Sequence, residues 1–441
     1  MRFEVEWLEA PGVRDCVLAA TWARLRIDAH GLDVTELVHL ASETRRSAVY
    51  GPVFPVVEWF IENWWNLLHE PSPTSPLMPG RDAPRWKQEW VQRHNLLAAR
   101  EGTALPDAAF VRDGDDIIIR WDPDPKEQGR SRVRFVGSGQ VRVDAEEFCR
   151  QATSFVERTL QRLSAVLDEN EDSQRAAEAW AAIRSADQEE RDLCRSLALL
   201  GLDPYDPDEA TDDIVNLITE LAASLPATLR NDLLEGARPG TLQPAADWIM
   251  RSRANLANGS AKHEHATLNS AWAPSAHQTG YQLARRARAH LLGLDQKEAI
   301  SDLDGLFVDR LGWDADPLRQ GDKLKWLDGL VGLSKDSHKP VVVDPGSRTG
   351  WAKRFLLARS AFFTVTGTVY QGRVLTRAVT RPQRAARAFA AELLAPASAI
   401  ADRVGGLVSQ DEVAELSEEF GVNPLLVQHQ LENHGLGAVS A

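Results

Sequence analysis

The chain has 441 residues, of which 43% are hydrophobic and 26% charged, so it is long enough for two or three globular domains. No apolar run approaches the ~20 residues that span a bilayer, and the N-terminus lacks a signal-peptide pattern. The three cysteines, Cys16, Cys149 and Cys194, are too few and too widely spaced for a disulfide framework or a structural zinc site. We therefore expect a cytoplasmic protein without a membrane segment.

The formal net charge of −14 is unevenly distributed along the chain. Residues 1–261 carry 29 Lys+Arg against 44 Asp+Glu, whereas residues 262–441 carry 21 against 20. The acidic N-terminal part disfavours non-specific binding to nucleic acid. Any contact with a polyanion is expected in residues 344–403, which hold ten basic and three acidic residues.

Residues 1–167 have the pattern of one α+β domain. Alternating apolar and polar residues predict strands within residues 1–30, and the turn dipeptide Pro11-Gly12 predicts that they form a hairpin or meander. Further strands are expected between residues 108 and 143. Asp144 is then the expected N-cap of a long helix that ends near Leu167.

A Trp-rich helix is predicted between Pro52 and Pro71, because an apolar stripe at helical spacing lies between the two prolines. Trp64 belongs to this stripe and is expected in the core. Trp59 and Trp65 flank the stripe, which leaves open that one of them lies exposed at an interface.

Residues 168–262 are expected to form an acidic helical region that prolines divide into short helices. A linker is predicted at Gly259–His265. From Gln278 the pattern changes to regular helices and two strands. The predicted helices are Gly280–Leu294, Ile300–Leu311, Lys353–Val365, Arg381–Leu394, Gln410–Phe420 and Pro424–Asn433, and the predicted strands are Leu324–Leu333 and Pro340–Asp344.

Two of these helices carry the candidate site. A zinc peptidase places His-Glu-x-x-His on one helix, so that two imidazoles share a face and the Glu serves as the base. At the three corresponding positions in Lys353–Val365 the chain has Arg359, Ser360 and Phe363. The second helix ends in Phe389-Ala390-Ala391-Glu392-Leu393-Leu394-Ala395-Pro396.

With these motifs, residues 278–441 resemble the ImmA/IrrE family of zinc metallopeptidase-like proteins. The likeness is carried by four stretches, which are Gly280–Leu294, Pro340–Asp344 with the helix that follows, Arg387–Pro396 and Val408–Gly435. The resemblance implies a zincin-like C-terminal domain with strands before the active-site helix and a short helical tail. It also implies that the third zinc ligand of active relatives corresponds to Glu392.

The chain departs from the family at the other metal positions. Arg359 is a permanent cation, Phe363 has no donor atom, and Ser360 cannot replace a Glu as proton acceptor. We therefore expect no zinc, no other cofactor and no catalysis. An Arg359–Glu392 ion pair is predicted to replace the metal, with Phe363 filling the volume of the second ligand.

The main binding candidates are the arginines of residues 373–387, which are Arg373, Arg377, Arg381, Arg384 and Arg387. Arg377, Arg381 and Arg384 would share one stripe if their helix began early, whereas Pro382 favours a later start. We favour a solvated helix face that partners the acidic N-terminal part. The alternative is an anion or nucleic-acid site.

The tail Val408–Gly435 has the pattern of two short helices around a Gly-containing turn, as in a helix-turn-helix. Its second helix has no Lys or Arg, which a DNA-reading helix normally needs. The tail is therefore expected to be structural.

Taken together, the sequence predicts an α+β multidomain protein with parts at 1–167, 168–262 and 278–441. The favoured function is a catalytically inactive zincin-like regulatory or binding protein with a protein partner. By analogy with the resembled family, it would act in bacterial stress, mobile-element or phage-defence regulation. The first alternative is an active metallopeptidase with non-standard ligands that cleaves a repressor or antitoxin partner, and the second is a nucleic-acid-binding regulator.

Overall fold

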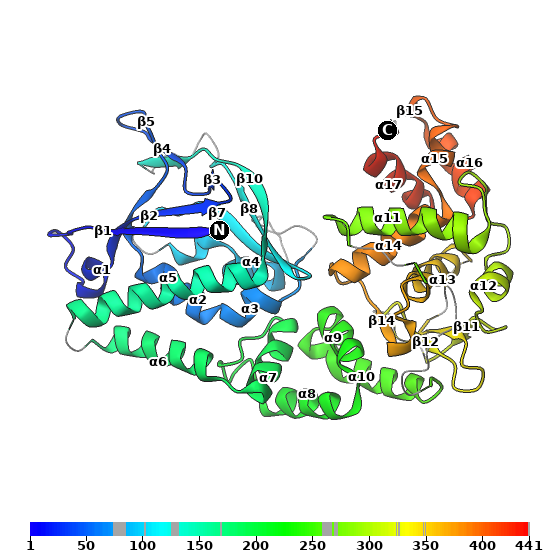
Figure 1. Cartoon of the computed structure of the whole chain (residues 1–441), viewed down its shortest axis with the longest axis horizontal. Helices are drawn as coiled ribbons and strands as arrows, with labels where there is room; N and C mark the ends of the chain where they lie inside the picture. Colours follow the sequence, from blue (N-terminus) through cyan, green and yellow to red (C-terminus); the bar gives the residue numbers. More distant parts are fainter. Residues whose placement is uncertain are drawn as a thin grey trace. The chain divides into compact units, whose positions relative to one another are not determined.

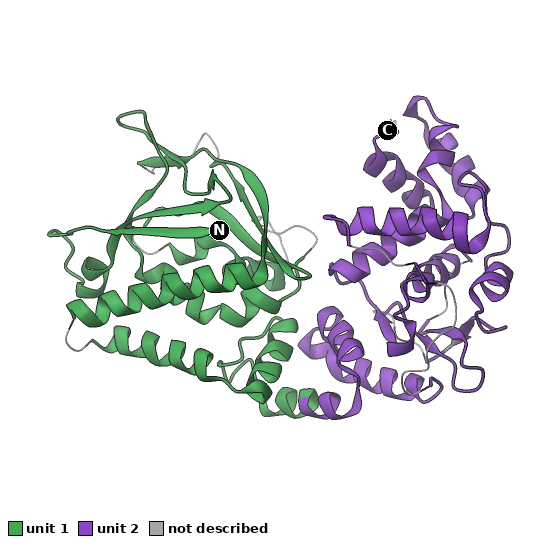
Figure 2. Cartoon of the chain, in the orientation of Figure 1, with its two compact units in different colours: residues 1–218 green, residues 219–441 purple. Residues whose placement is uncertain are grey.

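The computed structural model describes residues 1–73, 85–100, 103–124, 132–167, 170–257, 267–268, 272–322, 324, 327–346, 348 and 350–439. The predicted mixed α and β character is confirmed (Figure 1). Two compact units, unit 1 with residues 1–218 and unit 2 with residues 219–441, meet within helix α8 (Asp212–Ser224) (Figure 2). The division into three parts stays a prediction, and the predicted linker Gly259–His265 lies outside the described residues. Among the described helices, none is long and apolar enough to cross a membrane.

The first sheet of unit 1 contains the predicted hairpin. Strand β1 (Arg2–Trp7) pairs antiparallel with β2 (Trp22–Ala29), which also pairs with β3 (Leu32–Asp33) and β6 (Val49–Pro52). Every second residue of β2 is buried, as the two-residue period of a strand requires. The stretch before β2 is a short helix, α1 (Cys16–Ala20), because Asp15 caps it by accepting a hydrogen bond from the Leu18 amide (2.9 Å).

Unit 1 has two further three-stranded sheets and a set of helices. One sheet joins β7 (Asp107–Asp113), β8 (Asp116–Asp122) and β10 (Gly139–Asp144), and the other joins β4 (Leu37–His39), β5 (Thr44–Arg46) and β9 (Val133–Phe135). The helices are α2 (Phe54–Glu62), α3 (Trp64–His69), α4 (Arg85–His94), η1 (Leu96–Ala99), α5 (Ala145–Val166), α6 (Glu171–Ser185) and α7 (Gln188–Leu199).

The Trp-rich helix predicted between Pro52 and Pro71 is broken at Asn63 into α2 and α3. The Asn63 side chain donates to the Trp59 carbonyl (2.8 Å), so a side-chain bond ends α2. Trp59, Trp64 and Trp65 are all buried, and neither flanking tryptophan is exposed.

The long helix predicted after Asp144 is confirmed as α5, with Asp144 as its N-cap.

Unit 2 contains a four-stranded mixed sheet in the order β11 (Leu318–Gln320), β13 (Pro340–Asp344), β12 (Gly329–Leu333) and β14 (Arg373–Leu375). β11 is parallel to β13, and the other two pairings are antiparallel. Residues of β12 and β13 are buried throughout. β12 begins later than predicted, at Gly329, and the Asp328 amide extends the ladder by donating to the Leu375 carbonyl (2.9 Å).

The helices of unit 2 follow the sequence prediction closely. They are α9 (Ala227–Gly236), α10 (Pro239–Arg253), α11 (Ala276–Arg286) with the π-helical turn η2 (Ala287–Leu292), α12 (Leu303–Leu311), α13 (Gly350–Val365), η3 (Val369–Gln371), α14 (Arg381–Leu394), α15 (Ala397–Ala401), α16 (Gln410–Phe420) and α17 (Pro424–His434). Gly293 and Gly312 close the first two predicted helices with φ of 66° and 65°, where glycine is favoured. Strands β15 (Gly406–Val408) and β16 (Gly437–Val439) form a separate parallel pair.

Helices α11 and α14 lie side by side in unit 2 (Figure 1). Their close approach depends on Gly280, because a Cβ there would lie 2.3 Å from the Ala385 carbonyl oxygen and 2.7 Å from the Ala388 Cβ. α14 packs against α13 as well. α14 therefore contacts both α11 and α13, the helix that carries the candidate site.

Candidate functional site

The Arg359 side chain holds α13 against the sheet and α14. Its side chain is 3% exposed, and its Nη1 donates to Asp328 Oδ2 over 2.6 Å. Its Nη2 donates to the Thr376 carbonyl and to Gln383 Oε1. Asp328 precedes β12, Thr376 follows β14, and Gln383 lies in the first turn of α14. Burial lowers the pKa of Arg359, and Asp328 opposes that shift by stabilising the cation.

The predicted Arg359–Glu392 ion pair is wrong. Arg359 pairs with Asp328, and Glu392 pairs with Arg285 of α11 (Nε to Oε1, 2.7 Å). The reason is the angular position of the side chains around the axis of α14. Gln383 and Glu392 are nine residues apart, about two and a half turns, and therefore lie on opposite faces of α14. The face that meets Arg359 carries Gln383.

Ser360 and Phe363 are part of the core rather than a ligand site. Ser360 is fully buried, and its Oγ donates to the Leu356 carbonyl one turn earlier (2.8 Å). The Phe363 ring is also fully buried, with the Arg373 guanidinium 4.6 Å from its centroid. With Arg359 committed to three acceptors, the residues at these positions do not fit a zinc ion. Within the described ranges there is also no group of three or more His, Cys, Asp or Glu arranged to hold a metal.

Glu392 anchors the C-terminal tail instead. Its carboxylate is 1% exposed and accepts hydrogen bonds from Arg285 Nε (2.7 Å), Gln430 Nε2 of α17 (3.0 Å) and the Ala397 amide (3.3 Å). His434 Nε2, also on α17, lies 3.6 Å from Glu392 Oε2, and burial lowers the pKa of His434. These bonds join α17 to α11 and α14, which supports a structural role for the tail.

Arg373 and Arg381 each contact an acidic or aromatic side chain inside unit 2. Arg373 lies in β14 and forms a bidentate ion pair with Asp232 of α9 (2.6 and 2.8 Å). Arg381 starts α14, donates to the Ala273 carbonyl (2.5 Å) and places its guanidinium 5.3 Å from the Trp272 ring. Both side chains thus have intramolecular partners, and Arg373 is unavailable for a ligand.

The stripe of Arg377, Arg381 and Arg384 requires an early start of the helix, whereas α14 begins at Arg381 and Arg377 lies before it. The Arg377 side chain is 80% exposed and reaches within 4.0 Å of Asp328. Arg384 and Arg387 are half-buried on α14. Arg387 donates to the carbonyls of Thr376 (3.4 Å) and Ala378 (2.9 Å).

The surroundings of Asp328 carry an excess of positive charge. Arg348 donates to Asp344 (2.9 Å) and lies 3.7 Å from Asp328 Oδ1. With Arg359 at 2.6 Å and Arg377 at 4.0 Å from Asp328, three guanidinium groups share two carboxylates. Burial and repulsion from Arg359 lower the pKa of Arg387 to about 10.

Sequence reasoning missed Asp328 and Gln383, because neither lies in the motif and only the fold brings them to Arg359.

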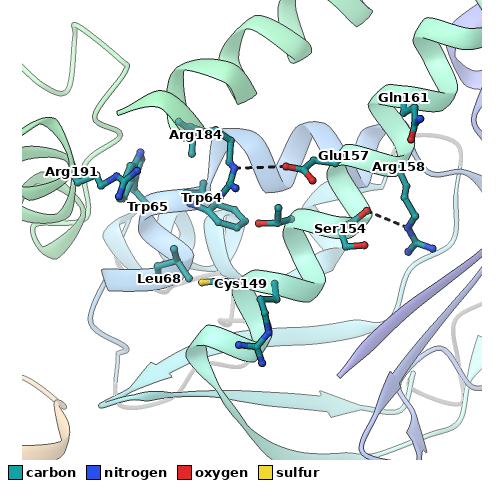
Figure 3. Close-up of a pocket in the computed structure, with 13 residues that line it drawn as sticks. Trp64, Trp65, Leu68, Cys149, Ser154, Glu157, Arg158, Gln161, Arg184 and Arg191 are labelled. Atoms are coloured by element: carbon teal, nitrogen blue, oxygen red, sulfur yellow. Dashed lines mark hydrogen bonds and ion pairs between the residues drawn. The ribbon is translucent and has the colours of Figure 1, made fainter. Parts of the chain in front are cut away.

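Unit 1 has a separate groove of about 580 Å³ where α3, α5, α6 and α7 meet (Figure 3). Trp64 and Trp65 contribute to its wall, and exposed arginines lie around it. Arg184 is within 3.7 Å of Glu157, and Arg158 donates to the Ser154 carbonyl (3.2 Å), as Figure 3 shows. No local sequence pattern predicts this groove, because its residues come from four helices.

Cys149 lies in the same groove and is half-buried. Burial raises the pKa of its thiol, so the thiolate that nucleophilic chemistry needs is disfavoured. The groove therefore offers guanidinium and aromatic groups for binding rather than an activated nucleophile.

Comparison of the chain with protein-family models and with curated proteins found no match. The function is therefore argued from the residues and their geometry.

Proposed function

We propose that residues 278–441 form a zincin-like module of the ImmA/IrrE type that has lost its metal and its catalytic role, and that the protein works by binding a partner. The observation that carries the proposal is the bonding of Arg359, at the position of the first ligand. Its guanidinium joins α13, the sheet and α14, as a metal held between these elements would. On this proposal, an ion pair with hydrogen bonds replaces the structural role of the metal.

On this proposal, the position of the third ligand is Gln383 rather than Glu392. Gln383 is the side chain of α14 that reaches Arg359, and its own amide donates to the Val374 carbonyl (2.7 Å). A neutral amide accepts from a guanidinium without a second buried charge. With Arg359, Ser360, Phe363 and Gln383 at the ligand positions, both terminal nitrogens of the Arg359 guanidinium are hydrogen-bonded, and only its buried Nε lacks a hydrogen-bond partner.

The partner is proposed to be a protein that the module holds without cleaving, by analogy with relatives that act on repressors and antitoxins. The nucleic-acid alternative is weaker, because Arg373 is occupied by Asp232 and Arg387 is half-buried. The active-peptidase alternative is weaker, because Ser360, at the position of the general base, donates to its own helix.

The proposal is tested by capturing the full-length protein from its native host with and without a zinc chelator. We expect an intact protein partner to be retained equally in both samples. Treatment with nuclease should leave that retention unchanged. Partner fragments that disappear with the chelator would instead support the active metallopeptidase, and release by nuclease would support the nucleic-acid regulator.

A further inference from the structure

Unit 2 contains a cavity of about 470 Å³ between α11, the start of α13, α14 and α17. Its wall is mostly apolar and includes Trp351, Phe355, Ala391, Leu425 and Leu426. Trp351 is 43% exposed and Leu425 is 55% exposed, so two large apolar side chains face solvent at this site. The volume lies within the range of about 300–1,000 Å³ that is typical of small-molecule sites.

An arginine is among the residues that line this apolar wall. Arg387 is the one Arg or Lys among the described residues that line the cavity. Its described hydrogen bonds go to two main-chain carbonyls, Thr376 and Ala378, although a guanidinium has five N–H donors. The side chain therefore keeps donors for a further acceptor.

The charge of Arg387 is poorly compensated inside unit 2. The nearby carboxylate of Asp328 is bonded to Arg359 over 2.6 Å. Asp344 is likewise bonded to Arg348. Burial and the neighbouring Arg359 disfavour the cation and lower the pKa of Arg387 to about 10. A half-buried cation of this kind is stabilised by an anion that reaches it.

We propose that this cavity binds a small amphipathic carboxylate, whose apolar body lies against Trp351, Phe355 and Leu425 and whose carboxylate pairs with Arg387. A planar guanidinium matches the two oxygens of a carboxylate, and the apolar wall disfavours a ligand that is charged throughout. The inference is independent of the proposed function, since it requires neither the zincin-like fold nor a protein partner.

The test uses isothermal titration calorimetry of the full-length protein with decanoate and with its uncharged counterpart decanamide. Decanoate should bind more tightly than decanamide. Arg387→Gln should weaken decanoate binding by about tenfold or more, since a hydrogen bond to a charged group is lost, and leave decanamide binding unchanged. Arg377→Gln is the matched control, because it removes the same charge from an exposed side chain that is not among the cavity residues.

A second variant keeps the test valid if Arg387→Gln fails to fold by circular dichroism. Leu425→Asp places a carboxylate at an exposed position of the wall, where it should repel decanoate and weaken its binding more than that of decanamide. The proposal is overturned if the wild-type protein binds no decanoate. It is also overturned if both cavity variants bind decanoate as tightly as the wild-type protein does. A protein that binds a peptide through its free C-terminal carboxylate but does not bind decanoate would overturn the proposal as well.

Discussion

Replacing Arg359 by methionine tests whether this residue holds the core of unit 2 together. The substitution keeps a long unbranched side chain and removes the charge. It removes one donor from each of three acceptors, which are Asp328 Oδ2, the Thr376 carbonyl and Gln383 Oε1. The Thr376 carbonyl keeps a longer bond from Arg387 (3.4 Å), and Gln383 Oε1 keeps one from the Thr376 amide (3.4 Å). All three acceptors belong to elements that α13 must contact, so the loss acts at the junction of α13, the sheet and α14.

The expected cost follows from burial. Removing one partner of a buried ion pair costs about 3–5 kcal/mol, because the other charge stays uncompensated. Asp328 is 17% exposed and keeps Arg348 at 3.7 Å, which places the cost at the lower end. If the free energy of local opening around α13 falls by about 3 kcal/mol, the equilibrium constant for that opening rises roughly a hundredfold.

Native-state amide hydrogen exchange of the full-length protein measures this equilibrium locally, which avoids assuming that two compact units unfold together. Protection of the α13 and β14 amides should fall about a hundredfold in Arg359→Met. Arg377→Met is the control, because an exposed ion pair contributes only about 0–1 kcal/mol. Equal protection in wild-type protein and Arg359→Met would refute the role assigned to Arg359.

Two further predictions concern backbone packing and pH. Gly280→Ala should destabilise unit 2 by about 1–2 kcal/mol in calorimetry, because the overlap with the Ala385 carbonyl outweighs the gain in helix propensity. Gly240→Ala, where the new Cβ meets nothing within 4 Å, should be neutral or stabilising, and equal effects would contradict the packing argument. Burial lowers the pKa of His69 from 6.5 to about 3, so the unfolded chain binds a proton there that the folded chain does not. Unit 1 should therefore lose stability as pH falls from about 6.5 towards 3, by up to about 1.4 kcal/mol per pH unit. Urea unfolding at several pH values checks this, and a slope unchanged in His69→Gln would assign the effect to other groups.

Local signals in the sequence predicted the helices of the C-terminal part well. α14 and α16 begin and end where predicted, since Pro382 fixes an early helical position and Gly421 adopts the left-handed conformation that closes α16. The break at Asn63 was missed. A single side-chain bond to the Trp59 carbonyl decides it, and the apolar pattern continues across the break.

Partners across long sequence distances were harder to predict. Arg359 and Glu392 are both charged and both belong to the motif, which favours their pairing, but the rotation of α14 turns Glu392 towards Arg285 and α17. The actual partner, Asp328, precedes a strand whose start was placed too early. The rotation of α14 and the position of Asp328 before β12, rather than residue type, decide which charged side chains pair.

The most direct test of the account is the zinc content of the untagged full-length protein after equilibration with zinc and removal of free metal. We expect far less than one zinc ion per chain and no change in thermal stability on adding zinc, because Arg359, Ser360, Phe363 and Gln383 offer no ligand set. One tightly held zinc ion per chain, together with a higher melting temperature in zinc, would contradict it.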